Sequence, residues 1–146
     1  MSNKPPAHQL FSLLHKVIFT ADRRANALLA EADIKSGFSE SLVLHALVHN
    51  KDTSQHSIAS CLNLTPAAVS RRIDTLVKRG LAKREEDTES RRTNRIILTA
   101  KGKRELEHMD KVLKQGFEKP VTSLSNKELS EACQILEKLL TALHAK

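Results

Sequence analysis

The stretch from residue 62 to residue 102 constrains the fold of this chain more than any other part. It contains the signals of a short helix, then a glycine, two strand-like runs that flank a charged loop, and the start of another helix. Thr65 can cap the short helix, Pro66 suits its first position, and Gly80 can end it in the left-handed conformation. This order predicts a winged helix-turn-helix, a module that inserts one helix into the major groove of DNA.

The positive charge of the chain is concentrated in the same region. The whole sequence has a formal net charge of +7, from 24 Lys and Arg against 17 Asp and Glu. Residues 66–104 hold 12 of these basic residues and 5 of the acidic ones, which accounts for the entire excess. A surface that neutralises phosphates needs such a cluster of cations. The distribution therefore favours nucleic acid as the partner over a membrane surface or an acidic protein.

Long amphipathic helices are expected on both sides of this region. Apolar residues recur at helical spacing from Ala7 to Ala32, and again after Thr99 and after Ser125. Trp and Tyr are absent, and there are only four Gly and four Pro, which favours helix packing over a turn-rich sheet. The expected fold class is mainly α with a small β-hairpin wing, a winged helix-turn-helix with N- and C-terminal dimerisation helices.

Three segments are expected within one intertwined domain. Residues 1–36 would form the N-terminal dimerisation helix, residues 37–99 the winged helix-turn-helix, and residues 100–146 the C-terminal dimerisation helices. Long apolar stripes at both ends favour a core that two subunits share. The alternative is a monomer in which the two ends pack only on each other. Pairing is favoured because two small reading units gain affinity and specificity from half-sites one helical turn apart.

Capping signals predict where the helices begin and end. A proline is unfavourable inside a helix, so the helix after the hairpin is expected to end before Pro120. Ser125 and Glu128 have the spacing of a capping box. The expected N-cap residues are Ser39, Ser54, Thr65, Thr99 and Ser125.

These motifs, in this order and spacing, resemble the MarR family of transcriptional regulators over nearly the whole chain. Ile58-Ala59 corresponds to the family's Leu-Ala pair, residues 70–81 to its recognition helix, and residues 87–92 with 98–102 to its wing. Ser90 stands where the family has a carboxylate that helps to hold the wing arginine. The resemblance implies a homodimer whose first and last two helices interlock. It also implies that the fourth helices enter major grooves of a pseudo-palindromic operator while the wings enter the flanking minor grooves.

The function that the resemblance implies is sequence-specific regulation of transcription, usually repression that a small molecule or an oxidant relieves. Two alternatives stay open: a winged-helix module that binds protein, and an architectural DNA-binding dimer without an effector. An enzyme has little support, because the chain has no Gly-rich phosphate loop, no Cys-x-x-Cys and no clear Ser-His-Asp order. No apolar run is long enough for a bilayer and no signal peptide is apparent, so a cytoplasmic protein without a membrane partner is expected.

The short helix and the wing carry the candidate DNA-binding residues. Burial of Val69, Ile73 and Leu76 would turn the opposite side of the helix outward, where Arg71 is the best candidate to read guanine. The two alanines are small enough for close approach, the hydroxyls can bind phosphates or base edges, and the wing-tip arginines suit a narrow minor groove. The set is Thr65, Ala67, Ala68, Ser70, Arg71, Arg72, Arg91, Arg92 and Arg95, with Lys101 and Lys103 expected on the DNA backbone.

The histidines and cysteines give weaker signals. His45 and His49 have a spacing that could hold a metal, but no strong ligand pattern surrounds them, so neither a metal nor a cofactor is expected. Cys61 and Cys133 are expected to be structural, Cys133 as a small buried hydrophobe. The family's geometry implies an effector pocket for a planar aromatic or carboxylate ligand, lined by His15, Phe19, Leu44, His45 and Met109.

Overall fold

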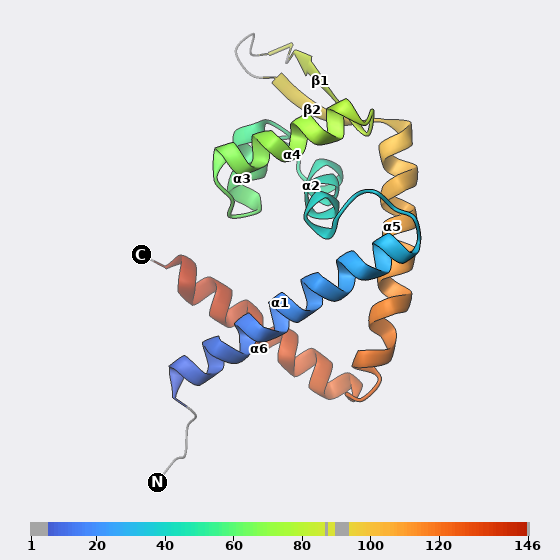
Figure 1. Ribbon diagram of the computed structural model, residues 1–146. Helices are drawn as coiled ribbons and strands as arrows, with labels where there is room; N and C mark the ends of the chain where they lie inside the picture. Colours follow the sequence, from blue (N-terminus) through green and yellow to red (C-terminus); the bar gives the residue numbers. More distant parts are fainter. Residues whose placement is uncertain (1–5, 87, 90–93, 146) are drawn as a thin grey trace. The chain divides into compact units, whose positions relative to one another are not determined.

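The computed structural model describes residues 6–86, 88–89 and 94–145, and it confirms a mainly α fold with a small antiparallel hairpin (Figure 1). The chain divides into two compact units, residues 1–113 and 114–146, and the division falls within one long helix. The elements are α1 (Ala7–Glu31), α2 (Phe38–His49), α3 (Gln55–Cys61), α4 (Pro66–Lys78), β1 (Ala82–Glu86), β2 (Asn94–Leu98), α5 (Ala100–Val121) and α6 (Asn126–His144). Across the described ranges, no helix combines the length and the apolar character that crossing a bilayer requires.

The core of the first unit surrounds α4. Val69, Ile73 and Leu76 have no exposed surface, as the helical spacing predicts. Side chains from α2, α3, the hairpin and α5 pack around them, because each of these elements turns an apolar side inward. Burial of one such aliphatic side chain stabilises the fold by about 1.5–3 kcal/mol. The fully buried partners include Val43, Leu44, Ile58, Leu81 and Met109.

Four of the five expected helix caps are confirmed. In each, a hydroxyl accepts a hydrogen bond from the backbone N–H three residues later, at 3.0–3.2 Å. The four caps are Ser54, Thr65, Thr99 and Ser125. The Glu128 carboxylate also accepts from the Ser125 N–H at 2.8 Å, which completes the capping box. These hydrogen bonds from Ser125 hold the pKa of Glu128 below its usual value.

The fifth cap prediction was wrong, because Ser39 lies inside α2. The residue before the helix is Gly37, whose backbone is extended (φ −82°, ψ 171°). Its N–H donates to the carboxylate of Glu40, and the Phe38 N–H donates to Asn26 Oδ1 at 2.9 Å. Acceptors from α1 and from the helix's own first turn therefore replace a capping hydroxyl.

The expected end of α5 was also wrong, because the helix runs through Pro120 to Val121. A proline lacks one N–H and crowds the carbonyl four residues earlier, so it is costly in the middle of a helix. Only the last residue of α5 follows Pro120. Just beyond the helix, the N–H of Thr122 donates to Glu118 O at 3.1 Å, which is the normal helical pattern. The disturbance is thus confined to the final turn.

The hairpin is attached to the core at its open end. Ala82 pairs with Leu98 and Arg84 with Ile96 in an antiparallel register. Ala82, Ile96 and Leu98 are buried, whereas the rest of β1 is exposed. Gly80 precedes the hairpin with φ +72°, the left-handed conformation expected at the end of α4. The wing is therefore a polar projection on an apolar base.

The two terminal helices expose much of their apolar surface within this single chain. In α1 only Ala25 and Leu29 are buried, both in its C-terminal half, and α6 has no buried residue. Cys133 is exposed, so the prediction of a buried thiol was wrong for the isolated chain; Cys61 is exposed as well. The physical reason for Cys133 is that the apolar stripe of α6 has no core of its own to enter. The exposed residues of α1 include Leu13, Val17, Ile18 and Phe19, and those of α6 include Ile135, Leu136, Leu140 and Leu143.

Candidate nucleic-acid interface

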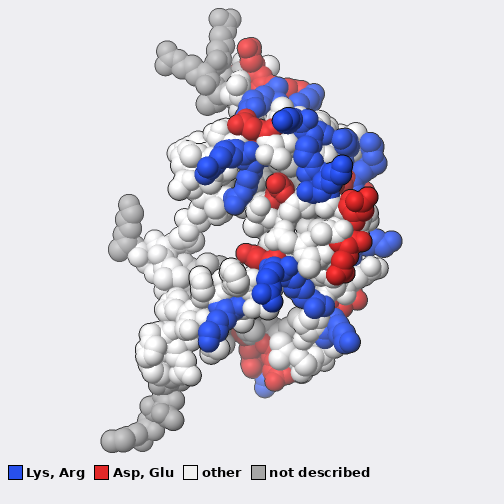
Figure 2. All heavy atoms as spheres, in the orientation of Figure 1, with Lys and Arg blue, Asp and Glu red and all other residues white. Residues whose placement is uncertain are grey.

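Helix α4 has one buried side and one polar, solvent-facing side. Around the buried Val69, Ile73 and Leu76, the predicted groove-facing residues all retain exposed surface. Figure 2 shows Lys and Arg side chains gathered over the region where Figure 1 has α4, the hairpin and the start of α5. Thr65, Ala67 and Arg71 are exposed, while Ala68, Ser70 and Arg72 are partly buried.

The first turn of α4 is well suited to approach an anion. Pro66 occupies the first helical position, and the Thr65 hydroxyl accepts from the Ala68 N–H at 3.2 Å. The cap uses the oxygen of this hydroxyl and leaves its proton for donation. No acidic residue lies in this first turn. The positive end of the helix dipole therefore faces outward without a competing carboxylate.

An ion pair joins α4 to the hairpin. Arg84 on β1 brings Nη2 to 2.5 Å from Asp74 Oδ1 on α4. Asp74 is the one carboxylate on α4, and its charge would otherwise oppose phosphate binding. The pairing with Arg84 offsets that charge. Periodicity could not reveal Arg84, because the contact depends on how the strand folds back beside the helix.

Arg95 lies near the loop end of the hairpin, opposite Glu85. It is exposed on β2 and forms an isolated β-bridge with Ser54, the residue before α3. The N–H of Ser54 donates to Asp52 Oδ1 at 2.8 Å. The backbone and side chain of Ser54, and then the charge of Arg95, hold the pKa of Asp52 below its usual value. Arg95 is thus anchored beside the helix-turn-helix, whereas Arg91 and Arg92, and Ser90 with them, lie outside the described residues.

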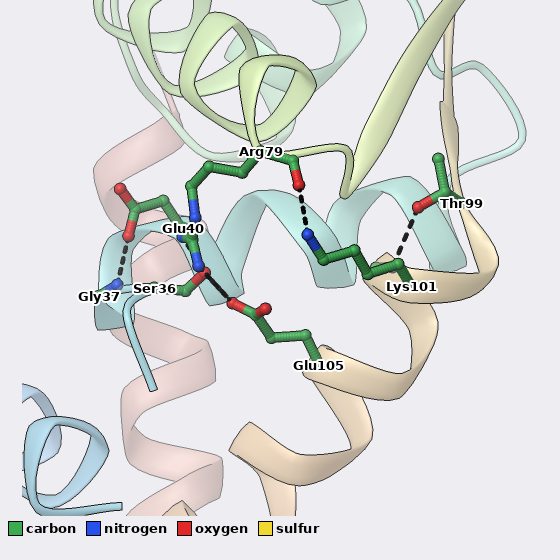
Figure 3. Close-up of polar contacts among 8 residues, drawn as sticks. Ser36, Gly37, Glu40, Arg79, Thr99, Lys101 and Glu105 are labelled. Carbon is green, nitrogen blue, oxygen red and sulfur yellow. Dashed lines mark hydrogen bonds and ion pairs between the residues drawn. The ribbon is translucent and has the colours of Figure 1, made fainter. Parts of the chain in front are cut away.

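A network of polar contacts holds the end of α4 (Figure 3). Arg79 Nη2 lies 2.9 Å from Glu105 Oε1 on α5, and Nη1 lies 2.6 Å from Ser36 Oγ in the α1–α2 loop. The Ser36 hydroxyl itself donates to Glu105, so the three side chains form a closed set. Lys101 Nζ donates to Arg79 O at 2.8 Å. Lys101 is exposed, and this contact uses one of its three N–H donors, so its expected contact with the DNA backbone stays a prediction.

We expect Glu105→Gln to lower the free energy of unfolding by about 1–2 kcal/mol, because it removes the charge that a mostly buried guanidinium faces. The Arg79 and Glu105 side chains are 25% and 19% exposed, so water screens part of the loss. Urea unfolding measures the change. Glu107→Gln on the exposed side of the same helix is the matched control, and its effect should stay within about 0.5 kcal/mol. Equal effects of the two changes would contradict the role of the network.

The five residues suggested for an effector pocket do not form one surface. Leu44 and Met109 are fully buried core residues, whereas His15 and Phe19 are exposed on α1. His45 Nε2 lies 2.8 Å from Asp110 Oδ1, beside a depression of about 270 Å³ between α2, β2 and α5. The pocket as a whole stays a prediction, and of the five only His45 lines this depression.

The spacing of His45 and His49 produces a ring contact. Their imidazoles stack with centroids 5.9 Å apart and planes 9° from parallel. Among the residues that the structure describes, no three His, Cys, Asp or Glu side chains are grouped so that they could hold a metal ion.

Comparison with known proteins finds one matching family model and a common fold. Residues 37–93 match the model of the MarR family. A search of curated protein sequences finds no match. The structure is similar to the transcriptional regulator BldR from Sulfolobus solfataricus, with a TM-score of 0.86 at 22% identity, over 97% of this chain and 99% of that one.

Two further similar structures were solved with DNA. A cysteine-to-serine mutant of MarR from E. coli, complexed with operator DNA, has a TM-score of 0.82 at 21% identity, over 90% of this chain and 94% of that one. The MepR–DNA complex from S. aureus has a TM-score of 0.78 at 24% identity, over 90% of this chain and 96% of that one. At these identities the likeness concerns the fold.

Proposed function

We propose that the protein, whose residues 37–93 match the MarR family model, is a dimeric, sequence-specific DNA-binding regulator of transcription. The observation that carries the proposal is the solvent-facing side of α4. It bears Arg71 and Arg72 above a fully buried stripe, at the centre of the region that holds the chain's charge excess. A helix with this polarity is suited to the major groove, where Arg pairs with guanine.

Selection of bound sequences from a random DNA pool tests this function. A palindrome with half-sites one helical turn apart is the expected result, because a two-fold symmetric dimer reads two such sites. Binding should also weaken steeply with salt, by roughly 0.9 in the log–log slope for each phosphate contact. Recovery of no motif would contradict sequence-specific regulation. Salt-dependent binding without a motif would favour the alternative of an architectural DNA-binding dimer, and absence of DNA binding would favour a protein-interaction module.

Dimerisation is supported by the apolar surface of the terminal helices. Val17, Ile18 and Phe19 on α1 are 60–65% exposed in the single chain. Monomeric soluble proteins rarely leave contiguous apolar patches of this kind in water. On α6, Leu140 and Leu143 are 56% and 64% exposed. A second copy of the chain is the occupant that the family resemblance implies for these faces.

We expect Ile18→Asp to convert the dimer into a monomer at micromolar concentration, because a charge would have to be buried in the apolar interface. Sedimentation or light scattering measures the mass of the particle. Lys16→Asp is a stringent control, since it changes the charge by two units, against one for Ile18→Asp, at a neighbouring exposed residue of α1. A dimer that survives Ile18→Asp would place the interface elsewhere, and a monomer in the unmodified chain would contradict dimerisation altogether.

The proposal also includes the mode of regulation, which is repression that a small molecule or an oxidant relieves. The depression beside His45 offers two imidazoles and two carboxylates around Leu106, which suits a planar aromatic ligand with a polar group. The exposed thiols of Cys61 and Cys133 are the groups through which an oxidant would act. Slow labelling of both by iodoacetamide would exclude a reactive thiolate, and thereby favour a small molecule as the effector.

A further inference from the structure

A second depression, about 720 Å³ in volume, opens at the C-terminal end of α4. The α1–α2 loop and the first half of α5 form its other walls, and all three parts belong to the first unit. Its volume lies in the range of small-molecule sites. Five of its lining residues are cationic and only Asp33 and Glu105 are acidic; the cations are Lys35, Lys78, Arg79, Lys101 and Arg104.

The inner wall of this depression is already ordered. Glu105 compensates the charge of Arg79, and the nearly fully buried Ser36 holds the other arm of the guanidinium. Two of the five N–H donors of Arg79 are used in these hydrogen bonds. The plane of the guanidinium is thereby fixed, and donors remain for a ligand that enters. Such a prearranged cation loses little freedom on binding.

The rim of the depression carries the uncompensated charge. Lys35, Lys78 and Arg104 are exposed, and none of them forms an ion pair with any part of the chain that the structure describes. Asp33 is the only carboxylate of the lining apart from Glu105. Several cations around a hollow in the surface raise the local concentration of anions.

We propose that this depression binds a small anion with at least two negative charges, such as a compound that carries two phosphate or two carboxylate groups. More than one charge is needed to engage the separate cations of the rim and the guanidinium within. A compact ligand is favoured over a DNA backbone because the side chain of Arg79 is only 25% exposed, and a rigid duplex would meet the rim alone. The inference goes beyond the regulatory function proposed above and does not depend on it.

Calorimetric titration of the full chain with inorganic pyrophosphate, and separately with citrate, tests the proposal without DNA present. We expect saturable binding of at least one of the two at low ionic strength, with one site per chain. Pyrophosphate alone would indicate a phosphate ligand, and citrate alone a carboxylate ligand. The double variant Lys35→Gln/Arg104→Gln should weaken this binding at least about tenfold, because two charge pairs are lost. Both side chains are exposed, so the fold should be retained.

The matched control is Lys111→Gln/Lys119→Gln, which removes the same charge from exposed residues of α5 outside the depression. It should leave the affinity for the anion unchanged. Equal weakening by the two double variants, or no saturable binding of either anion, would overturn the proposal. A further experiment measures the binding of a random-sequence DNA duplex at several salt concentrations. If Lys35→Gln/Arg104→Gln reduces the log–log salt slope of duplex binding by roughly 0.9 per residue, the depression belongs to the DNA surface and the proposal is wrong.

Discussion

Arg71→Ala should relax the choice of operator sequence as well as weaken binding. A bidentate arginine–guanine pair contributes about 1–3 kcal/mol of discrimination against the wrong base, which corresponds to roughly 5- to 150-fold. Arg71 is exposed on the side of α4 opposite the buried Val69 and Ile73, so its side chain can reach a base edge without disturbing the core. Truncation should therefore leave the fold intact and remove the contact.

The measurement is a pair of titrations, one with the selected operator and one with the same operator mutated at a single guanine position. The unmodified protein should distinguish the two, and Arg71→Ala should bind both with nearly equal affinity. Arg91→Ala is the matched control, because a wing arginine is expected to weaken binding to every sequence by a similar factor. If Arg71→Ala lowers specific and random-sequence binding equally, Arg71 contacts phosphate and does not read a base.

Gly102→Ala should destabilise the fold severely, by at least about 3 kcal/mol. A Cβ at this position would lie 2.0 Å from Leu81 O and 2.7 Å from Leu98 Cδ1. The nearer atom belongs to the backbone that leads into the hairpin and cannot turn aside. Thr99, which caps α5, donates its N–H to Leu81 O at 3.0 Å and its hydroxyl to Gly80 O at 2.7 Å, so α5 cannot withdraw without losing these hydrogen bonds.

The destabilisation expected for Gly102→Ala is opposite to the effect that helix propensity predicts. Ala is favoured over Gly inside a helix by about 1 kcal/mol, so propensity alone predicts that Gly102→Ala stabilises α5. The steric conflict with Leu81 should outweigh that gain, because a Cβ essentially never comes within 3.0 Å of a heavy atom from a residue distant in the chain. Urea unfolding should show a midpoint lower by roughly 1 M or more. An unchanged or higher midpoint would contradict the close packing of α5 on the hairpin.

Gly80→Ala is the matched control, since it makes the same chemical change with open space around the added atom. Apart from Gly80 and its two neighbours in the chain, no described residue has a heavy atom within 4 Å of the Cβ that would be added at Gly80. Only the left-handed conformation, φ +72°, opposes the substitution, and for an L-residue this costs about 1–2 kcal/mol. The two alanine variants thus separate backbone strain from direct collision.

Local signals predicted the reading unit well. Thr65 and Gly80 mark the two ends of α4 as predicted, because a helix cap and a left-handed turn depend on a few consecutive residues. The errors at Ser39 and Pro120 have a common origin. At the start of α2, Asn26 from another helix satisfies a backbone donor, and at the end of α5 the remaining turn tolerates a missing one. Neither compensation is visible in the neighbouring sequence.

In the candidate site too, local features were predictable from the sequence and contacts between elements were not. Helical periodicity was enough to turn Arg71 outward, since the burial of Val69 and Ile73 determines the opposite side of one rigid helix. The pairing of Asp74 with Arg84, and the network of Arg79, are contacts between elements. Residues distant in the chain meet there only after the hairpin and α5 have packed.

The linear order of residues was therefore sufficient to establish a mainly helical chain, a winged reading unit and the position of its charge, since these depend on periodicity, capping and composition. Packing between elements decided what each cation does. Lys101 donates to the backbone at the end of α4, and Arg79 is held by Glu105. A side chain's role depends on the groups that surround it in space, and those groups come from parts of the chain that no local pattern connects.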